Sequence, residues 1–225
     1  MSVLNARDGY RLWAPTYASE TAISHLEEQL VTSMTPPLAG LRLLDAGCGT
    51  GRRLRHTGAA SAVGVDLSPE MLDAGSGTDS RRDGVRMLVG DVRALPLPDR
   101  AFDVIWCRLV IGHLPEGERA YSELARVGDT GAWVIVTDFH PLAHAAGHRR
   151  TFRHEGTIHE VEHHVYEVST HLAAAHAVGL EPVGIREAKI GPAVRSFYEN
   201  AGRHALYEEH LGLPVVLALA FRRHG

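Results

Sequence analysis

An acidic residue and three glycines lie close together in a pattern suited to ligand binding. Asp45 ends a short apolar run, and Gly47, Gly49 and Gly51 follow it on alternate positions. Glycine has no Cβ, so the backbone can turn sharply there and lie close against a bound molecule. The amides at the start of a following helix would then face a negative or polar group. We therefore expect a ligand site here, with a purely structural turn as the alternative.

The spacing of these glycines differs from the fingerprint of dinucleotide-binding proteins, which reads G-x-G-x-x-G. Counted from Gly47 and Gly49, the third glycine of that fingerprint would fall at position 52, where the chain has Arg52. The observed pattern is D-x-G-x-G-x-G, from Asp45 to Gly51. This stretch therefore does not predict a dinucleotide as the ligand.

A second carboxylate closes a second apolar run. Residues 61–66 are typical of a short strand that ends in Asp66. In nucleotide-binding α/β folds, an acidic residue at this place can accept hydrogen bonds from both ribose hydroxyls, roughly 20 residues beyond the first turn. Ser68 is a suitable N-cap and Pro69 a suitable first residue for the helix that follows. We expect Asp66 to bind a ribose, and a surface turn is the alternative.

Further apolar runs complete a sheet. The expected strands cover residues 41–45, 61–66, 85–89, 102–108, 132–138, 180–190 and 214–222. The expected helices cover residues 19–34, 116–127, 170–177 and 192–211, and a polar loop is expected at 74–84. The runs at 102–108 and 132–138 are apolar almost throughout, as fully buried parallel strands should be. Alternating strands and helices predict a right-handed, parallel, doubly wound α/β sheet.

Several stretches resemble motifs of the class I S-adenosylmethionine (SAM) methyltransferases, in the branch that acts on small molecules. The glycine stretch resembles motif I of this family. Residues 64–72 resemble motif II, residues 90–92 motif III and residues 102–108 motif IV, and residues 110–115 resemble a further segment that is frequent in the family. The resemblance covers roughly residues 10–138 by motif and the rest by the order of elements only. It implies a Rossmann-like, doubly wound sheet of seven strands, mostly parallel. The last strand would be antiparallel and lie between the fifth and sixth.

The resemblance also implies SAM as the cofactor. Asp66 would bind the ribose, and Met71 would lie against the adenine. Asp91 would accept a hydrogen bond from the adenine amino group, which suits a carboxylate because it can only accept, and the amide of Val92 would donate to the ring. The implied cofactor-binding residues are Tyr10, Tyr17, Asp45, Gly47, Cys48, Gly49, Gly51, Asp66, Leu67, Met71, Gly90, Asp91, Val92 and Cys107.

The chain is expected to form one domain, residues 1–225, with four parts. Residues 1–35 would form helices in which Tyr10, Trp13 and Tyr17 either cap the cofactor or pack against the sheet edge. Residues 36–138 would be the SAM-binding core, and residues 170–225 would complete the sheet. Residues 139–169 correspond to an insert that commonly forms the substrate lid in this family, and they contain a possible hairpin around Glu155 and Gly156.

Methyl transfer from SAM is an in-line displacement, so the protein mainly aligns the acceptor with the methyl group. A phenolic acceptor, with a pKa of about 10, gains from a general base, whereas a neutral amine needs none. Histidine suits this work because its pKa lies near the working pH. His113 and His140 are the catalytic candidates because both follow strand ends that border the cofactor. The alternative is that they only shape the pocket or bind the substrate.

Nine of the 15 histidines lie between His140 and His176, which raises the question of a metal site. His140, His144 and His148 are spaced four apart and would share a face of a helix. No acidic triad resembling that of the metal-dependent catechol methyltransferases is visible, so we predict no metal. Surface histidines in a lid are the simpler interpretation.

Composition narrows the remaining possibilities. The net charge of −4 gives no general basic surface for nucleic acid. Residues 107–110 lack the Pro-Pro-Tyr signature of methyltransferases that act on nucleobase or glutamine amines. No signal peptide or membrane span is visible, so the expected compartment is the cytoplasm.

We expect a monomer or homodimer that methylates an oxygen or nitrogen of a small-molecule acceptor. Secondary metabolism is a plausible setting for this reaction. The alternative hypothesis is a protein that keeps the SAM pocket but catalyses another reaction, such as a cyclisation, or only senses SAM.

Overall fold

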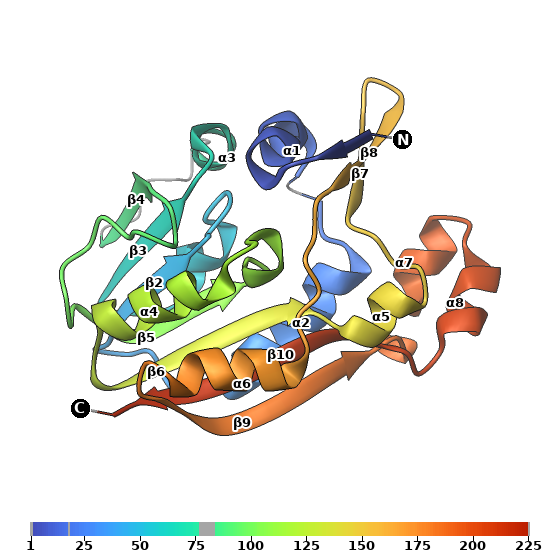
Figure 1. Ribbon diagram of the computed structural model, residues 1–225. Coiled ribbons are helices and arrows are strands. Elements are labelled where there is room, and N and C mark those ends of the chain that lie inside the picture. Colours follow the sequence, from blue (N-terminus) through green and yellow to red (C-terminus); the bar gives the residue numbers. More distant parts are fainter. Residues whose placement is uncertain (1, 18, 77–83, 225) are drawn as a thin grey trace.

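A seven-stranded sheet forms the centre of the computed structural model, which describes residues 2–17, 19–76 and 84–224 (Figure 1). The strand order is β4-β3-β2-β5-β6-β10-β9. All pairings from β4 to β6 are parallel, whereas β10 runs antiparallel to both β6 and β9. The expected seven-stranded sheet and its antiparallel last strand are therefore confirmed. The strands are β2 (Arg42–Ala46), β3 (Ser61–Asp66), β4 (Val85–Val89), β5 (Phe102–Arg108), β6 (Gly128–Phe139), β9 (Leu180–Lys189) and β10 (Pro214–Arg223).

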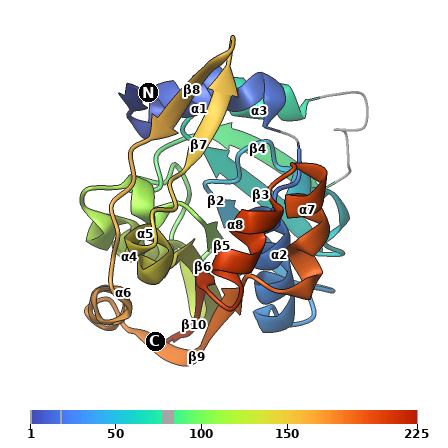
Figure 2. The same cartoon turned by 90° about the vertical axis from the view of Figure 1, so that its right-hand side faces the viewer.

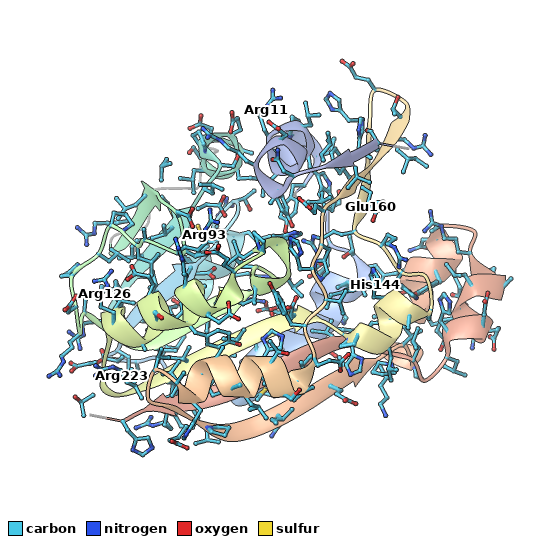
Figure 3. The ribbon with its side chains drawn as sticks, viewed as in Figure 1. Arg11, Arg93, Arg126, His144, Glu160 and Arg223 are labelled. Atoms are coloured by element: carbon cyan, nitrogen blue, oxygen red, sulfur yellow. The ribbon has the colours of Figure 1, made fainter. Side chains whose placement is uncertain are left out.

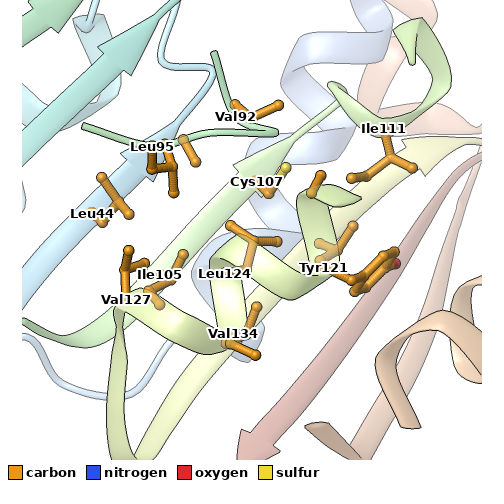
Figure 4. Close-up of a cluster of buried hydrophobic side chains, with 14 of the residues drawn as sticks. Leu44, Val92, Leu95, Ile105, Cys107, Ile111, Tyr121, Leu124, Val127 and Val134 are labelled. Atoms are coloured by element: carbon orange, nitrogen blue, oxygen red, sulfur yellow. The ribbon is translucent and has the colours of Figure 1, made fainter. Parts of the chain in front are cut away.

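Helices cover both faces of this sheet. They are α1 (Ala6–Trp13), α2 (Ala22–Met34), α3 (Pro69–Gly75), α4 (Gly117–Val127), α5 (Pro141–Ala145), α6 (Val168–His176), α7 (Arg195–Asn200) and α8 (His204–His210). Successive side chains of a strand point to opposite faces. Ile105 of β5 thus packs with Leu124 of α4 (Figure 4), and its neighbour Val104 packs with Val31 of α2. Burial on both faces explains why the run at 102–108 is apolar almost throughout.

Three connections differ from the expected alternation of strands and helices. The segment after β2 is a short 3-10 helix, η2 (Arg52–His56), and residues 90–101 between β4 and β5 form turns. Arg126 of α4 donates hydrogen bonds to the carbonyls of Leu95 and Leu97 in these turns, so a side chain holds this crossover in place of a helix. The helix expected at 192–211 is divided into α7 and α8 around Gly202, whose φ is +66°. The polar loop expected at 74–84 lies largely outside the described residues.

A second, three-stranded sheet joins the N-terminal segment to the insert. β1 (Ser2–Leu4) pairs in parallel with β8 (Thr157–Val161), and β8 pairs antiparallel with β7 (Thr151–His154). The hairpin turns at Glu155 and Gly156, as expected. Figure 2 shows α1, β7 and β8 at one end of the molecule, beyond the large sheet. We did not predict β1 from the sequence. The contact between the N-terminal segment and the insert was therefore not expected.

In the part of the chain that the structure describes, no helix is long and apolar enough to cross a membrane.

Candidate functional site

The glycine turn after β2 is fixed to the neighbouring strand β3. The amides of Gly47 and Cys48 both donate to the carbonyl of Val65, at 2.7 and 3.0 Å. Gly47 has a φ of +84°, and a Cβ there would lie 2.2 Å from Cγ2 of Val110. Gly49 has a φ of +58°. Both positions need glycine for the left-handed backbone, and Gly47 also needs it for the close approach of the segment that follows β5.

Asp66, at the end of β3, holds the same turn. Its Oδ2 accepts from the amide of Gly49 at 2.7 Å, and its Oδ1 accepts from the amide of Ser68 at 2.9 Å. Ser68 in turn caps α3 by accepting from the amide of Met71. Burial raises the pKa of Asp66, although the amide hydrogen bonds act in the opposite direction. Each carboxylate oxygen keeps a second lone pair, so Asp66 can position the turn and still accept from a ligand.

A cavity opens at the carboxyl ends of β2, β3, β4 and β5, with about 660 Å³ of empty space when the part open to solvent is included. It brings together ten of the residues expected from the sequence, which come from six separate segments. They are Tyr10, Tyr17, Gly47, Gly49, Asp66, Leu67, Met71, Asp91, Val92 and His113. The carboxyl ends of parallel strands are where open α/β sheets bind ligands.

A second cavity, with about 730 Å³ of empty space when the part open to solvent is included, shares a wall with the first. It adds two further expected residues, Asp45 and Cys48. Three expected residues line neither cavity. Gly51 lies against Met87, Gly90 lies against Pro96, and the Cys107 side chain is fully buried between β5 and α4 (Figure 4).

His140 is also absent from both cavity linings. Its Nδ1 accepts a hydrogen bond from the amide of Leu142 and so caps α5. Its Nε2 lies 3.1 Å from Oε1 of Glu187. Of the two histidines proposed for catalysis, the structure therefore places His113, and not His140, at the cavity. In the described part of the chain, no group of three or more His, Cys, Asp or Glu side chains is arranged to hold a metal ion.

Asp91 faces the first cavity with its carboxylate already held by one neighbour. Arg93, which is labelled in Figure 3, donates from its backbone amide and its guanidinium to both oxygens, at 2.7 to 3.2 Å. Arg93 keeps the pKa of Asp91 below its usual range, so this carboxylate stays ionised and can only accept. The sequence placed Asp91 at the site but gave no sign of this partner.

Asp45 is the buried acid of the second cavity. It is 2 % exposed, and its Oδ1 has no hydrogen-bond partner among the residues that the structure describes. Burial raises the pKa of Asp45 to about 7, while the nearby Arg108 acts to lower it. An unpartnered carboxylate oxygen in a cavity wall is suited to a cationic ligand group such as an ammonium.

His113 belongs to a chain of hydrogen bonds with the N-terminal segment and the insert. Its Nδ1 lies 2.9 Å from the carbonyl of Glu162, which can only accept, so Nδ1 carries the proton. Nε2 is then the acceptor for the hydroxyl of Tyr10 at 2.9 Å, and Tyr10 accepts from Nε of Arg150 at 2.7 Å. Burial lowers the pKa of His113 to about 3, with a smaller contribution from Arg150. His113 is therefore neutral at ordinary pH.

Two arginines of the site were missed by the sequence reasoning. Arg150 comes from the insert and lines both cavities. Arg108, at the end of β5, also lines both, and its Nε donates to Glu27 of α2 at 2.9 Å. Neither lies in a recognisable motif for this role, so only the three-dimensional arrangement reveals them.

Comparisons with known proteins agree with this geometry. Residues 44–136 match a family model described as a methyltransferase domain. A probable chloroplastic tocopherol O-methyltransferase of Oryza sativa is 33 % identical over 123 residues, which are 51 % of this chain and 34 % of that protein. The 27-O-demethylrifamycin SV methyltransferase of Amycolatopsis mediterranei is 30 % identical over 150 residues, 64 % of this chain and 54 % of that protein. The chain thus spans about half or less of these relatives.

Solved structures show the same fold. A SAM-dependent methyltransferase from Mesorhizobium loti has a TM-score of 0.70 at 23 % identity and covers 90 % of this chain and 100 % of its own. The cyclase SpnF has a TM-score of 0.72 at 20 % identity and covers 100 % of this chain and 98 % of its own. Residues 44–136 are therefore similar to a methyltransferase domain, and the chain has the fold of these solved structures.

Proposed function

We propose that the protein transfers a methyl group from SAM to an oxygen or nitrogen of a small molecule. One observation carries the proposal: Asp66 and Asp91, from the ends of adjacent strands, line a single cavity together with the glycine turn. Among the relatives are enzymes named for O-methylation and one named for N-methylation, the ajmaline N-methyltransferase of Rauvolfia serpentina. The name of the rifamycin relative supports a role in secondary metabolism.

The residues present fit the proposed cofactor. Gly47 and Gly49 leave the space that a Cβ would fill, and Asp66 offers lone pairs for ribose hydroxyls. Asp91 is an ionised acceptor for an adenine amino group. The unpartnered Oδ1 of Asp45 is suited to the ammonium of the amino-acid end. When bound, SAM would supply an activated methyl group on a sulfonium.

The chain itself would mainly bind and align the acceptor, since proximity and orientation account for much of the rate of a displacement. His113 lines the cavity, but its Nδ1 donates to the carbonyl of Glu162 and the lone pair of its Nε2 accepts from the hydroxyl of Tyr10. A general base works best when its pKa lies near the operating pH, and a pKa of about 3 makes His113 a weak proton acceptor. We therefore assign His113 to orienting the acceptor rather than to strong base catalysis.

The test is methyl incorporation from methyl-labelled SAM across a broad panel of small molecules, read by mass spectrometry. The proposal expects at least one product heavier by one methyl group, with stoichiometric S-adenosylhomocysteine. Binding of SAM without any methylated product would contradict it and would favour the rival, a cyclase or a SAM sensor. A variant such as His113→Gln should retain cofactor affinity but lose turnover.

A further inference from the structure

Arg150 places a positive charge in the wall that the two cavities share. Its Nε donates to the hydroxyl of Tyr10, and its Nη2 lies 3.4 Å from the hydroxyl of Tyr17. The guanidinium carbon also lies 5.7 and 5.6 Å from the ring centroids of Tyr10 and Trp13. All of these partners are neutral, and Arg150 forms no ion pair with any carboxylate in the described ranges. The carboxylate of Glu27 interacts with Arg150 only at longer range, and Glu27 is already paired with Arg108, so Arg150 has no carboxylate of its own among the described residues.

Arg52 is a second guanidinium without a counter-ion. It follows the glycine turn, lines the second cavity and has no ion pair within the described part of the chain. Burial lowers the pKa of Arg52. By contrast, Arg53 pairs with Glu28 at 2.9 Å and Arg108 pairs with Glu27. Arg7 also lines the first cavity without an ion pair among the described residues, but it is exposed to solvent. Two half-buried guanidiniums thus have no contact ion pair in the described site, Arg52 beside the glycine turn and Arg150 on the side of the insert.

The charges of SAM cannot neutralise both. The cofactor carries one carboxylate, one ammonium and one sulfonium, so its binding adds a net positive charge to the site. Its single carboxylate can pair with one guanidinium. We assign that carboxylate to Arg52, because Arg52 directly follows the glycine turn in the sequence. Taking a cation partly out of water without a partner is costly, so the second guanidinium, which is half-buried, favours an anion from another molecule. The other molecule in a methyl transfer is the acceptor.

We propose that the acceptor carries a carboxylate that pairs with Arg150, an inference that rests on the proposed methyltransferase function. Arg150 is joined through the hydroxyl of Tyr10 to Nε2 of His113. An acceptor anchored at the guanidinium would therefore extend along the same wall as His113. Charge-assisted bonds from a guanidinium to a carboxylate are roughly twice as strong as neutral ones, and they add geometric specificity.

The test compares carboxylate probes with their neutral amides. The protein is saturated with S-adenosylhomocysteine and titrated calorimetrically with phenylacetate, cinnamate and hexanoate, and with the primary amide of each. The proposal predicts that at least one acid binds about tenfold or more tightly than its amide, as expected for a charge-assisted pair. Arg150→Met should abolish this preference. Arg150→Lys should keep part of it, because the charge remains while the fork geometry is lost.

Arg153→Met is the matched control, because Arg153 lies on β7 of the same insert and its guanidinium donates to the carbonyl of Gly156, away from both cavities. It should leave the preference unchanged. Equal binding of acids and amides by the wild type, or a preference that survives in Arg150→Met, would overturn the inference.

A second arm separates the two possible sources of the carboxylate. S-adenosylhomocysteine has an amino-acid carboxylate, and 5′-methylthioadenosine has none. Arg150→Met should change the affinity for both by the same factor, because Tyr10 and Tyr17, which Arg150 contacts, would act on the nucleoside that the two ligands share. Measurable binding of 5′-methylthioadenosine also shows that the variant is folded. Weaker binding of S-adenosylhomocysteine alone would assign Arg150 to the cofactor and overturn the inference. Failure of the wild type to bind S-adenosylhomocysteine at all would instead refute the proposed function, and the inference with it.

Discussion

Gly47 shows how closely the glycine turn is fitted to the segment after β5. An alanine there would adopt an unfavourable φ of +84° and bring its Cβ to 2.2 Å from Val110. We predict that Gly47→Ala lowers the free energy of unfolding by about 1–2 kcal/mol for the backbone and by a further 1–3 kcal/mol for overpacking. Urea denaturation measures both effects together.

Gly40→Ala isolates the backbone part of that cost. Gly40 has a similar φ of +80° but nothing within 4 Å of the position of a Cβ. It should lose only the backbone contribution, about 1–2 kcal/mol. Equal losses in the two variants would show that Val110 moves aside freely and that the turn is not tightly packed.

Asp45 should give the stability a measurable pH dependence. Its pKa is raised by burial to about 7, so between about pH 4 and 7 the folded chain holds a proton at Asp45 that the unfolded chain has released. Stability must therefore fall as the pH rises through this window, by about 4 kcal/mol as an upper bound, and level off above it. Chemical denaturation from pH 4 to 9 should show this slope in the wild type.

Asp45→Asn supplies the comparison, because it cannot titrate. The difference in unfolding free energy between the variant and the wild type should change with pH between about pH 4 and 7. Above pH 7, the variant should also bind S-adenosylhomocysteine less tightly than the wild type does. A pH-independent difference would show that Asp45 is ionised throughout.

At the scale of elements, a buried ion pair fastens α2 over the carboxyl ends of β5 and β6. Glu27 is 3 % exposed and accepts from Arg108 of β5 and from the hydroxyl of Thr137 of β6. Arg108→Met would leave the carboxylate of Glu27 buried without its cation. We predict a loss of about 3–5 kcal/mol in the free energy of unfolding. In contrast, Glu199→Gln breaks the exposed ion pair with Arg195 and should lower the free energy of unfolding by less than about 1 kcal/mol. Equal losses in Arg108→Met and Glu199→Gln would contradict this account of the buried pair.

The contact between α1 and the hairpin rests on aromatic packing. Trp13 stacks on Phe152 with ring centroids 5.0 Å apart. We predict that Trp13→Ala increases amide hydrogen exchange across β7 and β8. The lost aromatic pair should lower the local stability by about 0.5–1.5 kcal/mol, in addition to the effect of the buried area that is lost. Exchange in β10, which lies between β6 and β9 in the large sheet, serves as the internal reference and should not change. Unchanged exchange in the hairpin would show that the backbone pairing of β1 and β8 suffices.

Local patterns predicted the elements that bury a regular apolar face. The run at 102–108 and the cap at Ser68 both depend on neighbours in the chain, and the structure has them where the sequence placed them. The division of residues 192–211 was missed because helical periodicity continues across Gly202. β1 was missed because a three-residue strand has no periodicity and exists only through its pairing with β8.

At the scale of the whole molecule, the site depends on contacts that no local pattern reveals. Tyr10 meets His113 across 103 positions of the chain and Arg150 across 140. The glycine turn and both strand-end acids could be placed from the sequence because their roles follow from the strand order. The charge balance of the cavities could not, because it depends on which arginines find a carboxylate after folding.

The central claim is that the glycine turn, Asp66 and Asp91 bind one adenosyl ligand. Calorimetric titration of S-adenosylhomocysteine into the wild type and Asp66→Asn tests it most directly, with Asp73→Asn on the exposed side of α3 as the control. Loss of charged bonds to the ribose and of the support for the turn should weaken binding by about a hundredfold in Asp66→Asn. Asp73→Asn should bind as the wild type does. Unchanged affinity in Asp66→Asn, or binding of a nicotinamide dinucleotide in place of the adenosyl ligand, would contradict the account.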